Sequence, residues 1–215
     1  MKQGKIKAVC FDMWGTLCTG GKGNEWKILQ QKLSADLIEP KLFRNRGEEI
    51  FFTRNLNVEN GLLQLTESLN LKSNKKTFNS ALRFWKSLAR KSQPFPETAF
   101  VLKKLAELGL RLFVVSNTDS EPFYFKVNET ALIKYFEKFF LSSELGLLKP
   151  DVRIFKTMQK YLAFSKDQIL MVDDSLYHGV LPARKFGWKA LWVSRKKTET
   201  NKFQIKSLEE IFNYL

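Results

Sequence analysis

The chain has 215 residues, of which 44% are hydrophobic and 13% aromatic, and its formal net charge is +14. This length and apolar content can fill a packed core, and they exclude a chain dominated by disorder. No apolar run approaches the roughly 18 to 20 residues that cross a bilayer. The basic residues 1–7 do not lead into a signal-peptide pattern. We therefore expect a cytoplasmic protein with no membrane partner.

The positive charge is distributed along the chain in short groups of lysine and arginine. A nucleic-acid interface requires a clustered basic face that displaces counterions from phosphates, so a nucleic-acid partner is not expected. The only two cysteines, Cys10 and Cys18, are expected to be reduced thiols in the cytosol. The sequence makes no prediction of the oligomeric state.

Residues 6–11 are predicted to form a first strand that ends at a Gly15-Thr16 turn. From residue 19 to residue 93 the pattern changes to a helical period. The apolar residues at three- and four-residue spacing there are Trp26, Leu29, Leu33 and Leu37, and Phe78, Leu82, Trp85, Leu88 and Ala89. Breakers at Gly20 to Gly23 and Gln93 to Pro96 bound this segment, which predicts an all-helical insert.

Strands and helices alternate again after Pro96. The predicted helices are 97–108, 151–162, one that ends at Gly187, and a last one opened by the capping box at 207–210; the predicted strands are 110–115, 139–142, 169–172 and 190–193. Strands joined by helical crossovers indicate an α/β fold with a doubly wound parallel sheet of Rossmann type. We expect this core in residues 1–18 and 94–215, and an all-helical cap domain in 19–93.

Acidic residues follow two of the predicted strands at their carboxyl ends. Asp12 follows the first strand, and Asp173 and Asp174 follow the strand at 169–172. The carboxyl ends of parallel strands meet at one edge of a sheet, where open α/β sheets bind their ligands. Acids gathered there would repel one another, so we expect a bound cation.

Four segments of the chain, in order, resemble the motifs of the haloacid dehalogenase (HAD) superfamily. The segments are Asp12-Met13-Trp14-Gly15-Thr16, the strand ending at Ser116-Asn117, Lys149-Pro150, and Val172-Asp173-Asp174-Ser175. Each motif alone is weak, but four at the expected element ends are strong. The resemblance spans essentially the whole chain and implies a HAD-like hydrolase with a helical cap.

The resemblance also implies a role for each matching residue. Asp12 would be the nucleophile, and Lys149 would place a positive charge against both Asp12 and an incoming anion. Hydroxyl and amide groups would hold the transferring phosphoryl oxygens, and they belong to Thr16, Ser116 and Asn117. An oxygen-ligand Mg²⁺ site would be formed by Asp12, the main-chain carbonyl of Trp14, Asp173 and Asp174.

Two positions depart from the family pattern. The superfamily's phosphatases carry an acid–base aspartate two residues after the nucleophile, where this chain has Trp14. General acid–base catalysis is worth about 10² to 10⁴ in rate, so hydrolysis should be slow unless Asp119, Glu121 or His178 substitutes. In addition, Gly179 replaces an aspartate that is common five residues after the metal-binding acid, which predicts a looser site.

We predict a Mg²⁺-dependent phosphatase that acts on a small phosphorylated metabolite through an aspartyl-phosphate at Asp12. One alternative is a 2-haloacid dehalogenase-like hydrolase, since that metal-free branch has an aromatic residue where Trp14 stands. Its halide-binding arginine would be Arg44, Arg46 or Arg54, but it carries a tyrosine where this chain has Phe155. The other alternative is a catalytically reduced binding protein that retains the pocket.

Overall fold

The computed structural model describes residues 5–20, 23–195 and 202–215. Residues 1–4 of the predicted core and Gly21-Lys22 of the predicted break lie outside the described residues. Within the described part of the chain, no helix is long and apolar enough to cross a membrane.

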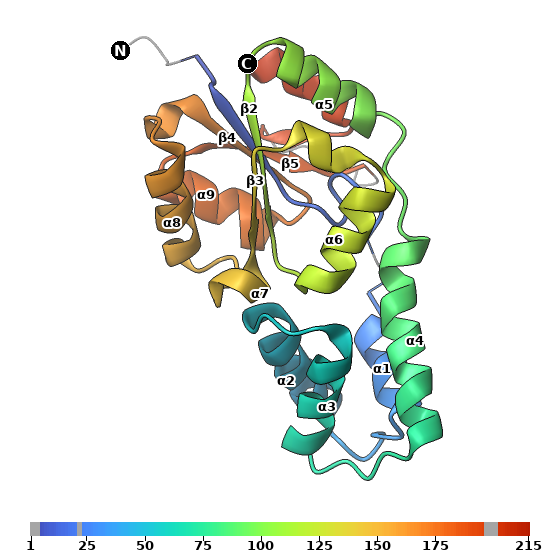
Figure 1. The fold of residues 1–215 in the computed structure, drawn as a ribbon. Helices are drawn as coiled ribbons and strands as arrows, with labels where there is room; N and C mark the ends of the chain where they lie inside the picture. The colour runs from blue at the N-terminus through green and yellow to red at the C-terminus, as the bar shows by residue number, and fades with distance from the viewer. Residues whose placement is uncertain (1–4, 21–22, 196–201) are drawn as a thin grey trace.

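A six-stranded parallel sheet forms the centre of the protein, which confirms the predicted α/β fold (Figure 1). Its strands are β1 (Ala8–Phe11), β2 (Arg111–Ser116), β3 (Lys138–Leu141), β4 (Ile169–Asp173), β5 (Lys189–Val193) and β6 (Gln204–Ile205). The strand order is β3-β2-β1-β4-β5-β6, and every neighbouring pair is parallel. The chain therefore winds outward from β1 in both directions, as in doubly wound folds.

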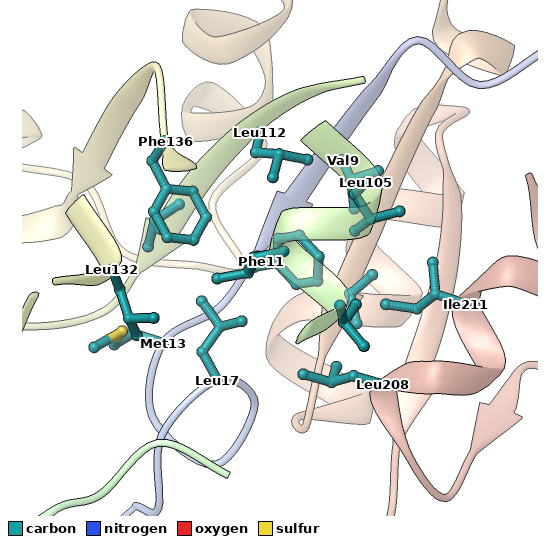
Figure 2. Packing of buried hydrophobic residues seen from close by; sticks show 14 of the residues in the cluster. Val9, Phe11, Met13, Leu17, Leu105, Leu112, Leu132, Phe136, Leu208 and Ile211 are labelled. Carbon is teal, nitrogen blue, oxygen red and sulfur yellow. The ribbon is translucent and has the colours of Figure 1, made fainter. Parts of the chain in front are cut away.

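Side chains alternate along each strand and so point to two faces of the sheet. Both faces are buried. Val9 and Phe11 of β1 point into one apolar cluster, while Ala8 and Cys10 point into another. The first cluster is covered by α5 (Thr98–Glu107), α6 (Ser120–Glu129) and the 3₁₀ helix η4 (Leu208–Tyr214). Figure 2 shows Leu105, Leu208 and Ile211 packed around Phe11 on this face.

Helices α8 (Val152–Leu162) and α9 (Leu181–Phe186) cover the second face of the sheet. The remaining short elements are η1 (Leu132–Tyr135), α7 (Ser142–Leu145), η2 (Lys166–Gln168) and the π-helical turn η3 (Leu176–Val180). Both Cys10 and Cys18 are buried free thiols, and burial raises the pKa of Cys18 to about 12.

The segment between β1 and α5 forms four helices below the sheet in Figure 1. They are α1 (Glu25–Lys32), α2 (Pro40–Thr53), α3 (Val58–Ser68) and α4 (Lys75–Lys91). These helices share an apolar cluster of their own, with Phe43, Leu62 and Trp85 among its members. We refer to α1–α4 as the helical unit; the domain boundaries at 18/19 and 93/94 stay a prediction.

Several details differ from the sequence-based expectation. Leu37 is fully exposed, because α1 ends at Lys32 and the apolar spacing continues by chance into the following turns. Strand β6 was not predicted, since its two residues are too few to show a period. The capping box at Ser207 is confirmed, but the element that it opens is a 3₁₀ helix.

Candidate active site

The carboxyl ends of β1 and β4 lie side by side and bring two aspartates together. Phe11 is in register with Val172, and the Asp12 amide donates a hydrogen bond to the Val172 carbonyl (2.9 Å). Asp12 is the first residue after β1, and Asp173 is the last residue of β4. Strands β2 and β3 lie on one side of β1, and β4 to β6 lie on the other. The two acids therefore occupy the switch point at which such sheets bind ligands.

The Lys149 side chain is buried against both of these acids. Its Nζ lies 2.9 Å from Oδ1 of Asp12 and 2.6 Å from Oδ2 of Asp173. Burial opposes the charged ammonium, but the negative charges of Asp12 and Asp173 outweigh that effect and raise the pKa of Lys149. Lys149 is therefore a fixed positive charge, as predicted from its motif.

Asn117 holds the loop that carries this lysine. Its Oδ1 accepts a hydrogen bond from the Lys149 amide (2.8 Å), and its Nδ2 donates to the Lys149 carbonyl (2.9 Å). One amide N–H of Asn117 is thus used inside the protein. These two hydrogen bonds tie the end of β2 to the loop that carries Lys149. Contact of Asn117 with a phosphoryl oxygen stays a prediction.

The two predicted hydroxyl residues also contact the acidic cluster. Ser116 Oγ donates to Oδ1 of Asp12 (3.0 Å). Thr16 is fully buried, and its Oγ1 accepts the main-chain N–H of Asp174 (2.9 Å). Since Lys149 binds the same Oδ1 atom, one oxygen of Asp12 is held by two donors. No described residue donates to the second oxygen, Oδ2, which is therefore free to react.

Asp12, Asp173 and Asp174 each offer a carboxylate oxygen, and these atoms all lie within 4.8 Å of one another. Partial burial and the negative charges of Asp12 and Asp173 raise the pKa of Asp174. Asp174 also packs against the loop after β1, where Gly15 has φ +86°. A Cβ atom on Gly15 would lie 2.1 Å from Oδ2 of Asp174, so only glycine allows this approach.

The three acids differ in how far their oxygens are already occupied. Asp173 accepts from Lys149 through Oδ2 and from the Ser175 amide through Oδ1 (2.8 Å). Asp174 is more exposed, and no other described residue donates to its carboxylate. Hard divalent cations bind carboxylate oxygens. The donor set therefore fits Mg²⁺, and Asp174 offers the carboxylate that is least occupied by other donors.

Trp14 begins a hydrogen-bonded chain that leads away from the cluster. Its Nε1 donates to Oγ1 of Thr118 (3.0 Å), which lies 3.4 Å from Oδ1 of Asp119. The other oxygen of Asp119 accepts from Nε1 of Trp85 in α4 (2.8 Å). Sequence reasoning did not find Thr118 or Trp85, because the helical unit cannot be registered against the core from its apolar period alone.

Of the three acid–base substitutes that the sequence suggested, only Asp119 lines the pocket that also contains Trp14. Glu121 forms an ion pair with Lys86 (2.8 Å) and accepts the Val58 amide at the start of α3. His178 is exposed and bonded to Ser175 (3.0 Å). Glu121 and His178 are therefore committed to structural contacts.

Burial raises the pKa of Asp119 to about 6, although hydrogen bonds from Trp85 and Thr118 oppose the shift. The folded chain then holds a proton that the unfolded chain has released, so stability falls as the pH rises from about 4 to about 6. The side chain of the Asp119→Asn variant does not titrate, so its stability lacks this dependence on pH. Across that window, we expect the wild type to lose up to about 3 kcal/mol relative to the variant. Urea unfolding at a series of pH values measures this difference, and parallel stability curves would contradict it.

Arg195 is a further residue that the sequence did not single out. Its Nη1 and Nη2 donate to the carbonyls of Gly15 (2.9 Å) and Thr16 (3.1 Å), and Nη2 also pairs with Glu97 (2.8 Å). The arginine therefore fixes the loop after Asp12. Its signal in the sequence was only a short basic group, of which Lys196 and Lys197 lie outside the described residues.

None of the suggested halide-binding arginines lines the pocket at Trp14. Each forms an exposed ion pair instead: Arg44 with Glu48, and Arg46 and Arg54 with Glu49. These three arginines already pair with glutamates of α2, and the halide-binding role suggested for them stays a prediction.

Comparison with known proteins agrees with this geometry. The family model described as haloacid dehalogenase-like hydrolase matches residues 6–187. The chain belongs to the haloacid dehalogenase-like hydrolase family. Its membership identifies the protein as a hydrolase, and the predicted family is confirmed.

Relatives of this HAD-like hydrolase fall into two functional groups. Haloacetate dehalogenase H-2 from Moraxella sp. (strain B) is 25% identical over 89% of this chain and 87% of its own. A glyceraldehyde 3-phosphate phosphatase from Methanothermobacter thermautotrophicus is 27% identical over 53% of this chain and 50% of its own. The crystal structure of a HAD phosphatase from Thermococcus onnurineus has a TM-score of 0.66 at 24% identity, over 97% of both chains. Dehalogenases and phosphatases are thus both represented at low identity.

Proposed function

We propose that this HAD-like hydrolase is a Mg²⁺-dependent phosphatase that acts on a small phosphorylated metabolite. The observation that carries the proposal is the buried Lys149 ammonium bonded to Asp12, with the open carboxylate of Asp174 within reach of the same cluster. A cation and a lysine together complement a dianionic phosphate. The three clustered carboxylates favour a metal-dependent reaction over the metal-free one of the dehalogenase branch.

In this proposal the metal is held by Asp12, Asp174 and the main-chain carbonyl of Trp14. When bound, Mg²⁺ would neutralise the repulsion between the acids and polarise the phosphoryl oxygens. Asp173 accepts one hydrogen bond at each of its oxygens, and its role as a metal ligand stays a prediction.

The chain's own residues support a covalent mechanism. Oδ2 of Asp12 attacks phosphorus and the bond from phosphorus to the leaving oxygen breaks, which leaves an aspartyl-phosphate. Water then attacks that phosphorus, releases phosphate and regenerates the carboxylate. Ser116 and Lys149 fix the other oxygen of Asp12 during both steps. Trp14 can neither protonate a leaving group nor activate water, so the second step is expected to be slow.

Asp173 acts through Lys149 and compensates for the missing aspartate at Gly179. A Cβ atom on Gly179 would lie 1.9 Å from Oδ2 and 2.1 Å from Cγ of Asp173. The Asp173 carboxylate therefore fills the space beside Gly179, and it binds the lysine at 2.6 Å. In this proposal the Asp173 carboxylate stands in for the absent aspartate at position 179 and holds Lys149 in place.

The Gly179→Ala variant is expected to lose about 1 to 3 kcal/mol of stability, because Asp173 must leave its place against Lys149. Thermal and urea unfolding measure the loss. Adding Asp173→Gly to Gly179→Ala should remove the steric part of it. Equal stability of the wild type and Gly179→Ala would contradict the close packing of these two positions.

The phosphatase proposal is tested by turnover of 4-nitrophenyl phosphate, whose leaving group departs without protonation. We expect activity with Mg²⁺, loss of activity in EDTA, and recovery when Mg²⁺ is restored. Full activity in EDTA would contradict the metal-dependent mechanism.

A 2-haloacid dehalogenase-like activity is the second candidate. Two observations favour it: the alignment with haloacetate dehalogenase H-2 over 89% of the chain, and the aromatic Trp14 in place of an acid. Against it, the pocket at Trp14 has no arginine among its described lining residues, and Phe155 is a buried core residue without a hydroxyl. Metal-independent release of halide from 2-chloropropionate would favour this candidate over the phosphatase.

A further inference from the structure

We propose that the natural substrate class of this enzyme is aryl phosphate monoesters, whose ring occupies the pocket between Trp14 and the helical unit. The inference rests on the proposed phosphatase function and extends it by naming the organic part of the substrate. It is carried by the shape, the aromatic walls and the hydrogen bonding of one cavity.

The cavity has a volume of about 640 Å³ and lies between the helical unit and the loops after β1 and β2. Trp14, two residues beyond Asp12, and Asn117, which brackets Lys149, both line it. An ester with its phosphorus at Asp12 would therefore extend its organic group into this space. The volume is in the range of pockets that enclose small organic ligands.

Aromatic side chains form much of the cavity wall. Besides Trp14, they are Trp26 of α1, Phe52 of α2, and Phe84 and Trp85 of α4. The rings of Trp26 and Trp85 lie 4.6 Å apart between centroids, and those of Trp26 and Phe52 lie 5.9 Å apart. Rings held by one another provide a preformed apolar surface on which a flat ring can stack.

Several polar groups in the lining are already paired within the protein. Ser92 Oγ donates to the Thr19 carbonyl (2.5 Å), and Thr19 Oγ1 accepts the Gln93 amide (2.9 Å). Asp119 accepts from Trp85, and Asn117 is bonded to Lys149. Each hydroxyl of a sugar phosphate would need its own partner when buried. Polyhydroxylated esters therefore fit this wall less well than an apolar ring does.

The charged side chains in the lining also favour a substrate with an uncharged organic group. Lys91 is the only cationic side chain among the described lining residues, and Glu25 and Asp119 are acidic. A second phosphate or carboxylate on the organic group would meet no cluster of positive charge there. The pocket therefore suits a neutral organic group.

The replacement of the acid–base aspartate by Trp14 has a consistent chemical consequence. A phenol is far more acidic than an alkyl alcohol, with a pKa near that of tyrosine, about 10. An aryl oxide can therefore leave phosphorus with less help from a general acid. The same residue removes the proton donor and adds an aromatic wall, and both changes suit aryl esters.

Binding of non-hydrolysable phosphonates tests the inference without turnover. Titration calorimetry in Mg²⁺ compares naphthylmethylphosphonate with methylphosphonate, on the wild type and on Phe84→Ala and Phe52→Ala. Phe100→Ala, a half-exposed ring on α5, is the matched control. We expect the wild type to bind the aryl ligand at least about tenfold more tightly. The pocket variants should lose most of this preference and the control should retain it.

Each result distinguishes the inference from the function on which it rests. Equal affinity of the two phosphonates for the wild type would overturn the aryl assignment and leave the phosphatase proposal intact. An aryl preference that survives in both pocket variants would overturn the placement of the ring in this cavity. If neither phosphonate binds and no phosphate ester is turned over, the phosphatase proposal fails together with this inference.

Discussion

Asp12→Asn is expected to abolish turnover of phosphate esters, with a loss on the order of 10⁴-fold or more. The amide cannot act as the attacking oxyanion, and no second described carboxylate combines an open oxygen with the bond to Lys149 that Asp12 makes. The fold should survive, because Lys149 keeps its contact with Asp173. Steady-state rates with 4-nitrophenyl phosphate measure the loss.

The control for this variant is Asp36→Asn, the same chemical change at an exposed residue of the helical unit. It should retain wild-type activity. Comparable turnover by Asp12→Asn and by the wild type would remove Asp12 from the chemistry, and the geometry around Lys149 would then need another explanation.

Trp14→Asp is expected to raise the rate of alkyl phosphate hydrolysis by about 10² to 10⁴. The variant restores the carboxyl group that the family's phosphatases have two residues after the nucleophile. Its surroundings are already polar on one side, since the Trp14 indole donates to the Thr118 hydroxyl. The gain should be smaller for 4-nitrophenyl phosphate, whose leaving group needs little protonation.

Trp14→Asn distinguishes the effect of the new carboxyl group from the effect of the space that loss of the indole creates. It has the size of the aspartate variant but no carboxyl group, and it should show no comparable gain. If Trp14→Asp is folded by circular dichroism but hydrolyses alkyl phosphates no faster than the wild type, the result would favour a binding protein that retains the pocket without being an efficient phosphatase.

The position of the acids could be predicted because parallel strands fix it. Asp12 and Asp173 each follow a short run of buried apolar residues, and residues at the carboxyl ends of neighbouring strands must meet. The sequence also predicted Lys149, since the motif around it resembles the family. In the structure Phe11 is in register with Val172, and Lys149 contacts both acids.

The contacts between the helical unit and the core could not be predicted. An apolar period shows which face of α4 is buried but not what it meets, so the bond between Trp85 and Asp119 left no sequence signal. The exposed Leu37 was taken for a helical position because the apolar spacing continues past the end of α1 at Lys32. The close packing of Asp173 against Gly179 also could not be predicted, because the turn of η3 brings the two residues together.

The central claim is that Asp12 forms a covalent intermediate, and mass spectrometry of the acid-quenched enzyme tests it most directly. Because Trp14 cannot activate water, the intermediate should accumulate after a burst of product. We predict a phosphoryl group on the peptide that contains Asp12 after reaction with an aryl phosphate and Mg²⁺, and none in Asp12→Asn. Turnover without any adduct on that peptide, or an adduct only with 2-haloacids, would contradict the account.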